Sequence, residues 1–558
     1  MAIANVWSQP TTRRLRMAAA GVVRSTALAV ALGSALPVIA AEADIDRREG
    51  VPADASPVRG DIGGVSPRGG GRATAALQTP AAALPESPGS ERSVKEHVPP
   101  DMSPRLFAQF QLPPASPEGG PPVLQLQKHL PYQYVFGTDP QWVYRSNADL
   151  DKGVRDNLST VLPSVNGLVT YRPEDWLEAT VEVQIEREIV VHEEKVVNLP
   201  DGTTQVAEKK RHSILLDQAH LTIREFTAPF SISIGRKGFE DERRSLIDGS
   251  MDGVSVLLRQ GRFRGEAIVG RMAFWEWEFS PRQVQARDKI NTFYSFGEYR
   301  LSDDAKLAGF AIARNDTAPP VLDPNSGLLL GEGSPKWFGI RVLGAPSAEV
   351  SYWAEGSLLS GRDELSTQFK GRAYDIGFTN RLFGLPLNPN FTVGYAFASG
   401  DDDPNDNRNT EFRQTGLQSE ERRFAGVTQF LVFGEGLQPD LSNIKITTLG
   451  VGIRPDPQLS LDLVWHSYRL HKNGIVRNSA LTAEANQVDS HLSRNLGKGV
   501  DLILGARNLL GVRRLGLDLR VGIFKPGSAY SRNVGTDPAN PIMVRAHNSI
   551  STILILWW

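Results

Sequence analysis

The sequence contains no cysteine, no marked excess of either charge and, beyond its N-terminal region, no long hydrophobic run. The absence of cysteine excludes disulfide bonds and thiolate metal sites, and it suits export into an oxidising compartment. The 61 basic and 63 acidic residues nearly balance, so no polycationic surface indicates a nucleic-acid partner. Without a run of about 18 apolar residues, the mature chain offers no candidate transmembrane helix.

The N-terminus has the pattern of a secretory signal. Three arginines within residues 13–16 precede an apolar run over residues 17–39, and the small residues of "PVIAAEAD" follow it. We therefore predict a signal peptide at residues 1–41. A retained transmembrane helix is the alternative, and Arg24, which interrupts the run, disfavours it.

Residues 42–125 are rich in proline, glycine, alanine and serine, as in "SPRGGGRATAALQTPAAALPESPGS". Large apolar side chains are too few there to offset the entropy lost on folding. We predict a disordered leader, with a tether as the functional alternative. The remaining residues, 126–558, form a second domain after the leader.

Hydrophobic residues alternate with polar ones through this second domain. In "LEATVEVQIEREIVV", residues 177–191, one parity carries Leu177, Val181 and Ile185, whereas the other carries Glu178 and Glu182. A period of two over so many residues predicts a long β-strand with one apolar face. Similar segments recur about 18 or 19 times, and we include "QVDSHLSRNL", residues 487–496, among them.

The connections between these segments alternate between short and long. "RPED", "LSDD" and "GAPS" are turns, whereas residues 401–439 form a long loop. These features predict an all-β fold, a transmembrane antiparallel β-barrel of about 18 strands with short periplasmic turns and long outer loops. Its place is the outer membrane of a Gram-negative bacterium, with membrane lipid and the barrel-assembly machinery as partners. A large soluble β-sandwich or propeller is the rival fold.

The last segment, "NSISTILILWW", predicts the strand that closes the barrel. Leu554, Leu556 and Trp558 share the lipid-facing parity, and Ser549 and Ser551 share the inward one. A terminal aromatic residue such as Trp558 resembles the signal by which outer-membrane barrels are recognised for assembly.

Three blocks resemble the outer-membrane alginate export family: residues 397–446, residues 521–530 and "SISIGRKGFEDER" at residues 231–243. The resemblance implies an eighteen-stranded monomeric barrel with an electropositive lumen. It also implies gating by inserted loops and an anionic uronate polymer as the substrate, with a periplasmic scaffold as a further partner.

Only part of the family's set of lumen arginines is present. Arg520 matches one of them, whereas Gln438, Gln429 and Gly238 stand where the family has arginine. A lumen of mixed charge also suits a less charged polymer or small solutes. Our candidates for lining the pore and attracting substrate are Arg224, Arg236, Asp241, Arg271, Glu276, Arg520 and Gln438.

The long loop at residues 401–439 is the candidate gate, because loops of this length are usually functional or disordered. Within it Arg413, Glu420, Arg422 and Glu435 are expected to latch onto charges of the barrel wall. A solvated loop that makes no such contact is the alternative.

The sequence shows no pattern that indicates catalysis. It has no phosphate-binding glycine-rich loop and no nucleophile elbow, and its histidines lack the spacing of metal ligands. Asp401 and Asp403 form a weak calcium candidate, with an exposed acidic loop as the simpler interpretation. We therefore expect no cofactor and no enzymatic activity.

The sequence thus predicts a passive outer-membrane export channel for an anionic, alginate-like polysaccharide. The alternative is a general or substrate-specific porin for small solutes. A barrel that serves as an enzyme or adhesin is a third hypothesis, and acidic residues of the outer loops would then be essential.

Overall fold

The computed structural model describes residues 132–557, apart from residues 149, 151–156, 194–209, 228, 273–289, 317–320, 323–328, 331–332, 364–365, 404–405, 478, 482, 484, 487–491, 513 and 531–545. The predicted signal peptide and leader, Glu276 and Trp558 lie outside these residues. Among the described residues the helical elements are the 3-10 turns η4 (Leu509–Gly511) and η5 (Ser528–Tyr530), and no helix is long and apolar enough to cross a membrane.

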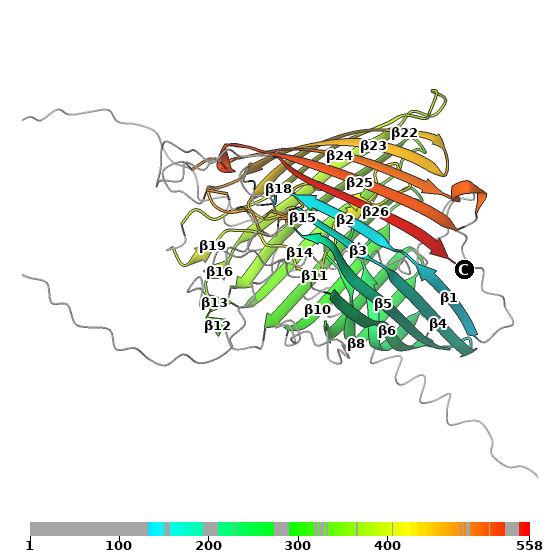
Figure 1. The fold of residues 1–558 in the computed structure, drawn as a ribbon. Coiled ribbons are helices and arrows are strands. Elements are labelled where there is room, and N and C mark those ends of the chain that lie inside the picture. The colour runs from blue at the N-terminus through cyan, green and yellow to red at the C-terminus, as the bar shows by residue number, and fades with distance from the viewer. Residues whose placement is uncertain are drawn as a thin grey trace, which may run out of the picture. The chain divides into compact units, whose positions relative to one another are not determined.

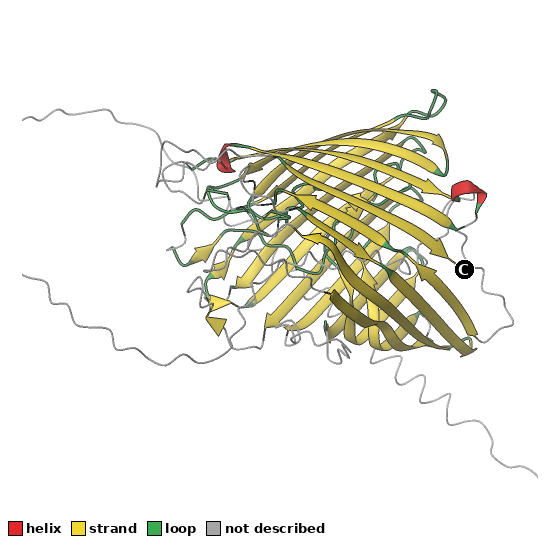
Figure 2. Cartoon of the chain, viewed as in Figure 1, coloured by secondary structure: helices red, strands yellow, loops and turns green. Residues whose placement is uncertain are grey.

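The chain forms a closed antiparallel β-barrel of 18 strands, as predicted (Figures 1 and 2). Its elements are β1 (Tyr132–Thr138), β2 (Gln141–Ser146), β3 (Leu158–Leu162), β4 (Ser164–Glu174), β5 (Leu177–Glu193), β6 (Lys210–Thr227), β7 (Phe230–Glu240), β8 (Asp248–Gln260), β9 (Phe263–Arg271), β10 (Ile290–Arg300), β11 (Ala305–Asp316), β14 (Ser334–Gly344), β15 (Val350–Arg362), β17 (Gly371–Arg381), β18 (Asn390–Ala398), β22 (Ile444–Asp456), β23 (Leu459–Leu470), β24 (Asn495–Arg507), β25 (Leu515–Pro526) and β26 (His547–Trp557). Short strands in the connections are β12 (Val321–Leu322), β13 (Leu329–Leu330), β16 (Gln368–Phe369), β19 (Arg408–Asn409), β20 (Glu421–Arg422) and β21 (Phe430–Leu431).

Prolines at facing positions interrupt the first two spanning strands. Pro140 separates β1 from β2, and Pro163 separates β3 from β4, while Gln141 pairs with Leu162 beside them. Proline has no N–H to donate, but its carbonyl still accepts a hydrogen bond. The Leu554 N–H donates to the Pro140 carbonyl at 3.1 Å. Each interrupted pair therefore serves as one spanning strand.

Strand β26 closes the barrel, as predicted. It pairs with β25 on one side and with β2 and β1 on the other. Ser549, Ser551 and Ile553 are buried, whereas Leu554 is 42% exposed. The alternation expected from the sequence is therefore confirmed, and the sheet has no open edge in lipid.

The two faces of the strands differ as the period of two requires. On β5, Val181 and Ile185 are exposed by 46% and 52%, whereas Glu178 and Glu182 are buried. An apolar outer face and a polar inner face are the pattern of a barrel in a bilayer.

Short turns and long loops lie at opposite ends of the barrel. The β4–β5 and β8–β9 turns span two residues each, residues 175–176 and 261–262, whereas the β18–β22 connection spans residues 399–443. This asymmetry assigns the turns to the periplasmic end and the loops to the outer end. Residues 487–491 of the strand expected at residues 487–496 lie outside the described residues; of the rest, residues 492–494 are not strand and Asn495 and Leu496 begin β24, so the described part forms no separate strand. In the connection before β24, the Asn486 side chain donates to the Ser493 carbonyl at 3.0 Å and accepts from the Ser493 N–H at 2.8 Å.

The inside of the barrel holds a hydrophobic core. Phe430 and Leu437 of the β18–β22 connection pack in one cluster with Ile446 of β22, Tyr468 of β23 and Phe524 of β25. These strands carry apolar residues on their inward parity, which would be unfavourable beside water. The inserted connection and the wall therefore bury one another's apolar surface.

Deletion of residues 549–558 should abolish insertion of the barrel. The deletion removes most of β26 and leaves β25 and β2 with unpaired backbone groups, which lipid does not tolerate. Membrane fractionation and the heat-dependent mobility of the folded barrel on gels measure the outcome. Normal amounts of inserted, heat-modifiable barrel would contradict it. Replacement of Trp558 alone by alanine tests the predicted assembly signal separately.

Candidate functional site

The β18–β22 connection, residues 399–443, folds into the barrel, and we call it the inserted loop. Its side chains are largely buried, including the charged groups of Glu411, Glu420, Arg422 and Glu435. The short strands β20 and β21 form a hairpin within it. The loop expected to fold into the lumen therefore does so.

The inserted loop is bonded to several strands of the wall. The indole N–H of Trp337 on β14 donates to the Arg413 carbonyl at 2.7 Å, and Arg314 on β11 donates to the Thr415 carbonyl. On the opposite part of the wall, the Tyr468 hydroxyl donates to the Phe433 carbonyl at 2.9 Å. Anchors on β11, β14 and β23 hold the loop across the lumen.

The connection between β7 and β8 at the outer end, residues 241–247, is a second segment inside the barrel, and we call it the β7–β8 turn. Asp241 organises it by accepting hydrogen bonds from the Leu246 and Ile247 N–H groups at 2.8 and 3.0 Å. The same carboxylate pairs with Arg341 of β14 at 2.6 Å. Burial raises the pKa of Asp241, but Arg341 and the two N–H groups more than offset that effect and hold it below its usual range. Asp241 thus positions the turn.

The two inserted segments touch each other. The Thr415 hydroxyl of the loop donates to the Leu246 carbonyl at 2.5 Å, and the Asp248 N–H donates to the Leu417 carbonyl at 2.6 Å. The turn and the loop therefore form one structure within the lumen.

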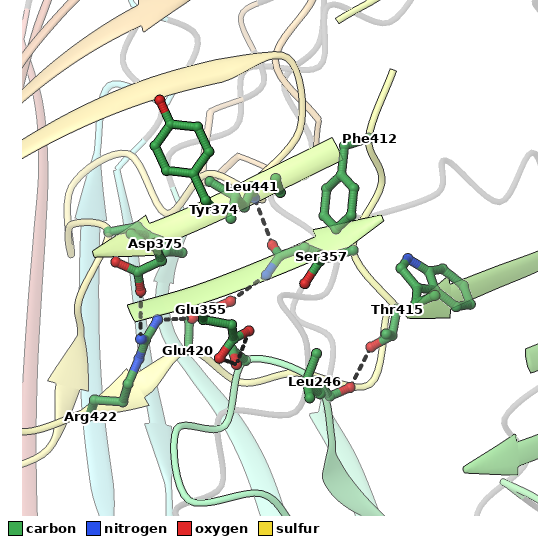
Figure 3. Close-up of a pocket in the computed structure, with 15 residues that line it drawn as sticks. Leu246, Glu355, Ser357, Tyr374, Asp375, Phe412, Thr415, Glu420, Arg422 and Leu441 are labelled. Atoms are coloured by element: carbon green, nitrogen blue, oxygen red, sulfur yellow. Dashed lines mark hydrogen bonds and ion pairs between the residues drawn. The ribbon is translucent and has the colours of Figure 1, made fainter. Parts of the chain in front are cut away.

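A network of ion pairs connects both segments to the wall (Figure 3). Asp375 of β17 accepts from Arg243 of the turn. It also accepts, at 3.0 Å, from Arg422 of the loop, which pairs with Glu420 as Figure 3 shows. Farther round the wall, Arg520 of β25 donates to Glu421 at 2.7 Å. Of the predicted latch residues, Arg422 pairs with Asp375 of the wall and Glu435 lies 3.8 Å from Arg520 of the wall, whereas Glu420 pairs with Arg422 within the loop.

Carboxyl groups outnumber guanidinium groups in this network. The guanidinium groups belong to Arg243, Arg244, Arg341, Arg422 and Arg520, and the carboxyl groups to Glu240, Asp241, Asp248, Glu355, Asp375, Glu420, Glu421 and Glu435. Burial raises the pKa of Glu420 to about 7, and burial likewise raises the pKa of Glu435 to about 7. Protonation of these two groups near neutral pH reduces the excess of negative charge.

A cavity of about 20 Å³ remains where the loop meets β15 and β17 (Figure 3). Its lining includes Glu355, Asp375, Phe412, Glu420 and Arg422. That volume holds about one water molecule. At this place the loop therefore packs against the wall without room for a sugar unit.

Three predicted pore residues lie in different surroundings. Arg224 faces the lumen near the turn end and pairs with Glu178. Arg236 and Arg271 stand beside Asp252 in one cross-strand row, on the parity of the outward-facing Ile234 and Val269. The alternation in "FSISIGRK" already grouped Arg236 with Ile232 and Ile234, so the sequence contained this signal.

Gln438 bonds within the inserted loop, whereas Arg413 of the same loop contacts β16. The Gln438 side chain donates to the Glu435 carbonyl at 3.0 Å and closes a turn. The Arg413 guanidinium lies over the ring of Phe369 at 5.1 Å. Gln429 accepts a hydrogen bond from Arg244 at 2.9 Å.

The calcium candidate belongs to no metal-binding cluster. Asp401 accepts hydrogen bonds from the Thr410 N–H and hydroxyl groups. Within the described ranges, no three or more His, Asp or Glu side chains are grouped so as to hold a metal ion.

Apart from Arg224, sequence reasoning missed a group of basic residues at the periplasmic mouth. Glu178 is shared by Arg224 and Arg172 of β4, and Glu266 of β9 is shared by Arg264 and Lys237. Each of these carboxylates therefore faces two cations, which leaves positive charge at the mouth. Strand parity relative to the exposed neighbours would have identified these residues.

Further arginines at this end lack a partner altogether. Arg259 of β8 and Arg300 of β10 are exposed on the lumen-facing parity. The Arg423 side chain of the inserted loop is also exposed. Desolvation by the surrounding barrel, and then the charges of Arg507 and Arg244, lower its pKa. Within the part of the chain that the structure describes, none of these three side chains makes a hydrogen bond or ion pair. They present unneutralised positive charge to whatever enters from the periplasm.

Comparison with known proteins gives one family. Residues 123–541 match the family described as "Alginate export". The chain is similar to the alginate production protein AlgE of Azotobacter vinelandii, with 29% identity over 164 residues, which cover 26% of this chain and 33% of that protein. The same protein of Pseudomonas syringae pv. tomato is 24% identical over 246 residues, covering 36% of this chain and 47% of that protein. The chain thus spans less than half the length of either relative.

Solved structures with a similar course of the chain include two outer-membrane channels. OccK11 of Pseudomonas aeruginosa has 12% identity and a TM-score of 0.44, covering 76% of this chain and 95% of that one. OccAB3 of Acinetobacter baumannii has 8% identity and a TM-score of 0.46, covering 76% and 99%. The fold assignment rests on the strand pairing described above.

Replacement of Asp375 by asparagine should release the inserted loop. The change leaves Arg243 and Arg422 without their shared carboxylate, and breaking a buried pair costs about 3–5 kcal/mol. Single-channel conductance in planar bilayers should rise, and protease should cut the loop faster. Glu349→Gln in an exposed periplasmic turn is the control. Unchanged conductance in a correctly folded Asp375→Asn barrel would show that the ion pairs do not hold the loop.

Rising pH should loosen the inserted loop between about pH 4.5 and 7. The pKa of Glu435 is about 7 when the loop is lodged and near 4.5 when it is exposed, so the lodged state binds the extra proton. Stability is full below this window and falls by on the order of 3 kcal/mol as pH rises through it. Glu420 shares this raised pKa, so the double variant Glu420→Gln/Glu435→Gln keeps both groups neutral and should abolish the response, measured as conductance at pH 5 and pH 8. A wild-type channel equally closed at both values would contradict this.

Proposed function

Because the chain belongs to the alginate export family, we propose that it is a passive outer-membrane channel through which an anionic uronate polysaccharide leaves the cell. The chain is an outer-membrane β-barrel with a porin-like fold. On this proposal it conducts a polymer and performs no reaction on it.

The unneutralised arginines at the periplasmic mouth carry the proposal. Arg259, Arg300 and Arg423 face the entrance without partners, and Arg224 shares its carboxylate with a second arginine. A guanidinium group binds carboxylate in a bidentate geometry, and one uronate unit offers one carboxylate. Several sparse cations attract such a chain without trapping it. The first contact of the polymer is therefore with the mouth.

The network at the level of the inserted loop has a different role. Arg341 and Arg520 are almost fully buried and satisfied by carboxylates, so neither is available to a passing polymer. Asp241, Glu420 and Arg422 hold the two inserted segments against the wall. We infer that these residues stabilise a closed gate, which must be displaced before a sugar chain passes the small cavity beside it.

Conductance measurements test the proposed function. The channel with a released loop, Asp375→Asn, should prefer anions, and uronate oligomers added on the periplasmic side should block it. The double variant Arg259→Gln/Arg423→Gln should weaken the block by about two- to fivefold for each arginine, since an exposed charge pair contributes about 0.2–1 kcal/mol.

The matched control is Arg187→Gln/Arg494→Gln, which removes equal charge from the outward face and from the outer β23–β24 connection. It should leave the block unchanged. Cation preference with no block by uronate oligomers would rule out the anionic polymer. Rapid liposome swelling with small neutral sugars, without any block, would favour the porin alternative.

A further inference from the structure

Basic residues gather on the outward face of the barrel at its outer end. Strands of one sector contribute them, apart from β18 between β17 and β22: Arg372 on β17, Lys445 on β22, Arg469 on β23, Lys498 on β24 and Lys525 on β25. Each shares the parity of exposed apolar residues farther along its strand, such as Val451 after Lys445 and Ile523 before Lys525. We call these five residues the basic patch. Strands β22 to β25 lie side by side in Figure 1, coloured yellow to orange, and β18 lies between β22 and β17.

Two pairs of like charges stand directly opposite each other in the patch. Lys445 pairs in register with Arg469, and Lys498 pairs in register with Lys525. Like charges at such positions destabilise a sheet, because the side chains on one face lie about 5 Å apart. Within the described residues none of the five makes an ion pair with a carboxylate. Asp402, in the same region of the described residues, pairs with Lys472 at 2.7 Å.

Aromatic rings lie immediately beneath the charges. Lys445 stands over the ring of Phe397 at 5.9 Å, and Lys498 over the ring of Trp465 at 6.0 Å. Tyr374 stacks on Phe397 with ring centroids 5.0 Å apart. A girdle of aromatic residues marks the interface between hydrocarbon and headgroups. The basic patch therefore lies at the level of the outer-leaflet headgroups.

His471, which follows β23, lies in the positive electrostatic field at the edge of the basic patch. Desolvation, and then the charges of Lys445, Lys472 and Arg372, lower its pKa. Its ring also accepts a hydrogen bond from the Gly400 N–H at 3.0 Å. Cations from separate strands thus act together at one place.

The opposite part of the wall lacks such a surplus. There Arg236 and Arg271 stand on either side of Asp252 in a cross-strand row, and Arg236 pairs with that carboxylate at 3.4 Å. The positive charge of Arg236 is therefore compensated by Asp252, whereas that of the basic patch is uncompensated. A ligand with several negative charges is expected only at the basic patch.

We propose that the basic patch binds the phosphorylated diglucosamine headgroup of lipopolysaccharide in the outer leaflet. That headgroup carries phosphate groups and lies at the depth of the aromatic girdle, with acyl chains below it. Phosphate oxygens bridge Lys445 to Arg469 and Lys498 to Lys525, which relieves both like-charge pairs. The exposed Leu449, Val451, Leu463 and Val500 beneath the patch contact the acyl chains.

The test uses the full mature barrel in nanodiscs and measures retained lipid by native mass spectrometry. The wild-type protein should bind bisphosphorylated lipid A in preference to its dephosphorylated form. The variant Lys498→Gln/Lys525→Gln should lose about tenfold or more in affinity, since each basic residue near an anionic surface contributes about fivefold. Heat-dependent mobility on gels verifies that the variant is folded.

The control, Arg187→Gln/Arg262→Gln, removes the same charge from sites outside the patch and should bind as the wild type does. Equal binding of phosphorylated and dephosphorylated lipid A would overturn the proposal. So would equal losses in the control and the patch variant. Displacement of the lipid by inorganic phosphate at matched concentration would show that the patch recognises a free anion instead of the headgroup.

Discussion

The closure of the hydrogen-bonded sheet is the constraint on which the rest of this structure depends. In lipid each backbone N–H and C=O needs a partner, so β26 must return to β1 and β2 and leave no edge. Because the sheet is closed, the side chains of every strand alternate between one face toward lipid and one face toward the lumen. The facing prolines, Pro140 and Pro163, are tolerated because their carbonyls still accept hydrogen bonds. The barrel is thereby a rigid frame for the segments inside it.

The inside of the frame is governed by the cost of burying charge. Arg341 and Arg520 are at most 2% exposed, and each is held by more than one carboxylate. Buried ion pairs are weak contributors to stability when intact, but loss of one partner is expensive. Such a network therefore fixes where the inserted loop lies without making it permanently stable there. The mouth, where Arg259 and Arg300 remain in contact with water, is free to bind an anion.

Sequence patterns anticipated some parts of the site and not others. The length of residues 401–439 indicated an inserted loop, and the charges of Glu420 and Arg422 indicated a latch. Neither indicated that Asp375 and Arg243 would complete it, because these residues lie on a strand and a turn far apart in the chain. Arg236 was grouped with the lumen for its similarity to a family motif, and it stands beside Asp252, which is 3% exposed.

By itself the sequence determined the strands, their number, the asymmetry of turns and loops, and the closing role of the last strand. Each of these follows from local period, length or position, which the chain carries without reference to distant partners. The tertiary structure alone decided which charges neutralise one another and which stay free. A buried arginine needs a carboxylate within a few ångströms, and only strand register and the path of the inserted loop bring Arg520 to Glu421 or leave Lys498 facing Lys525.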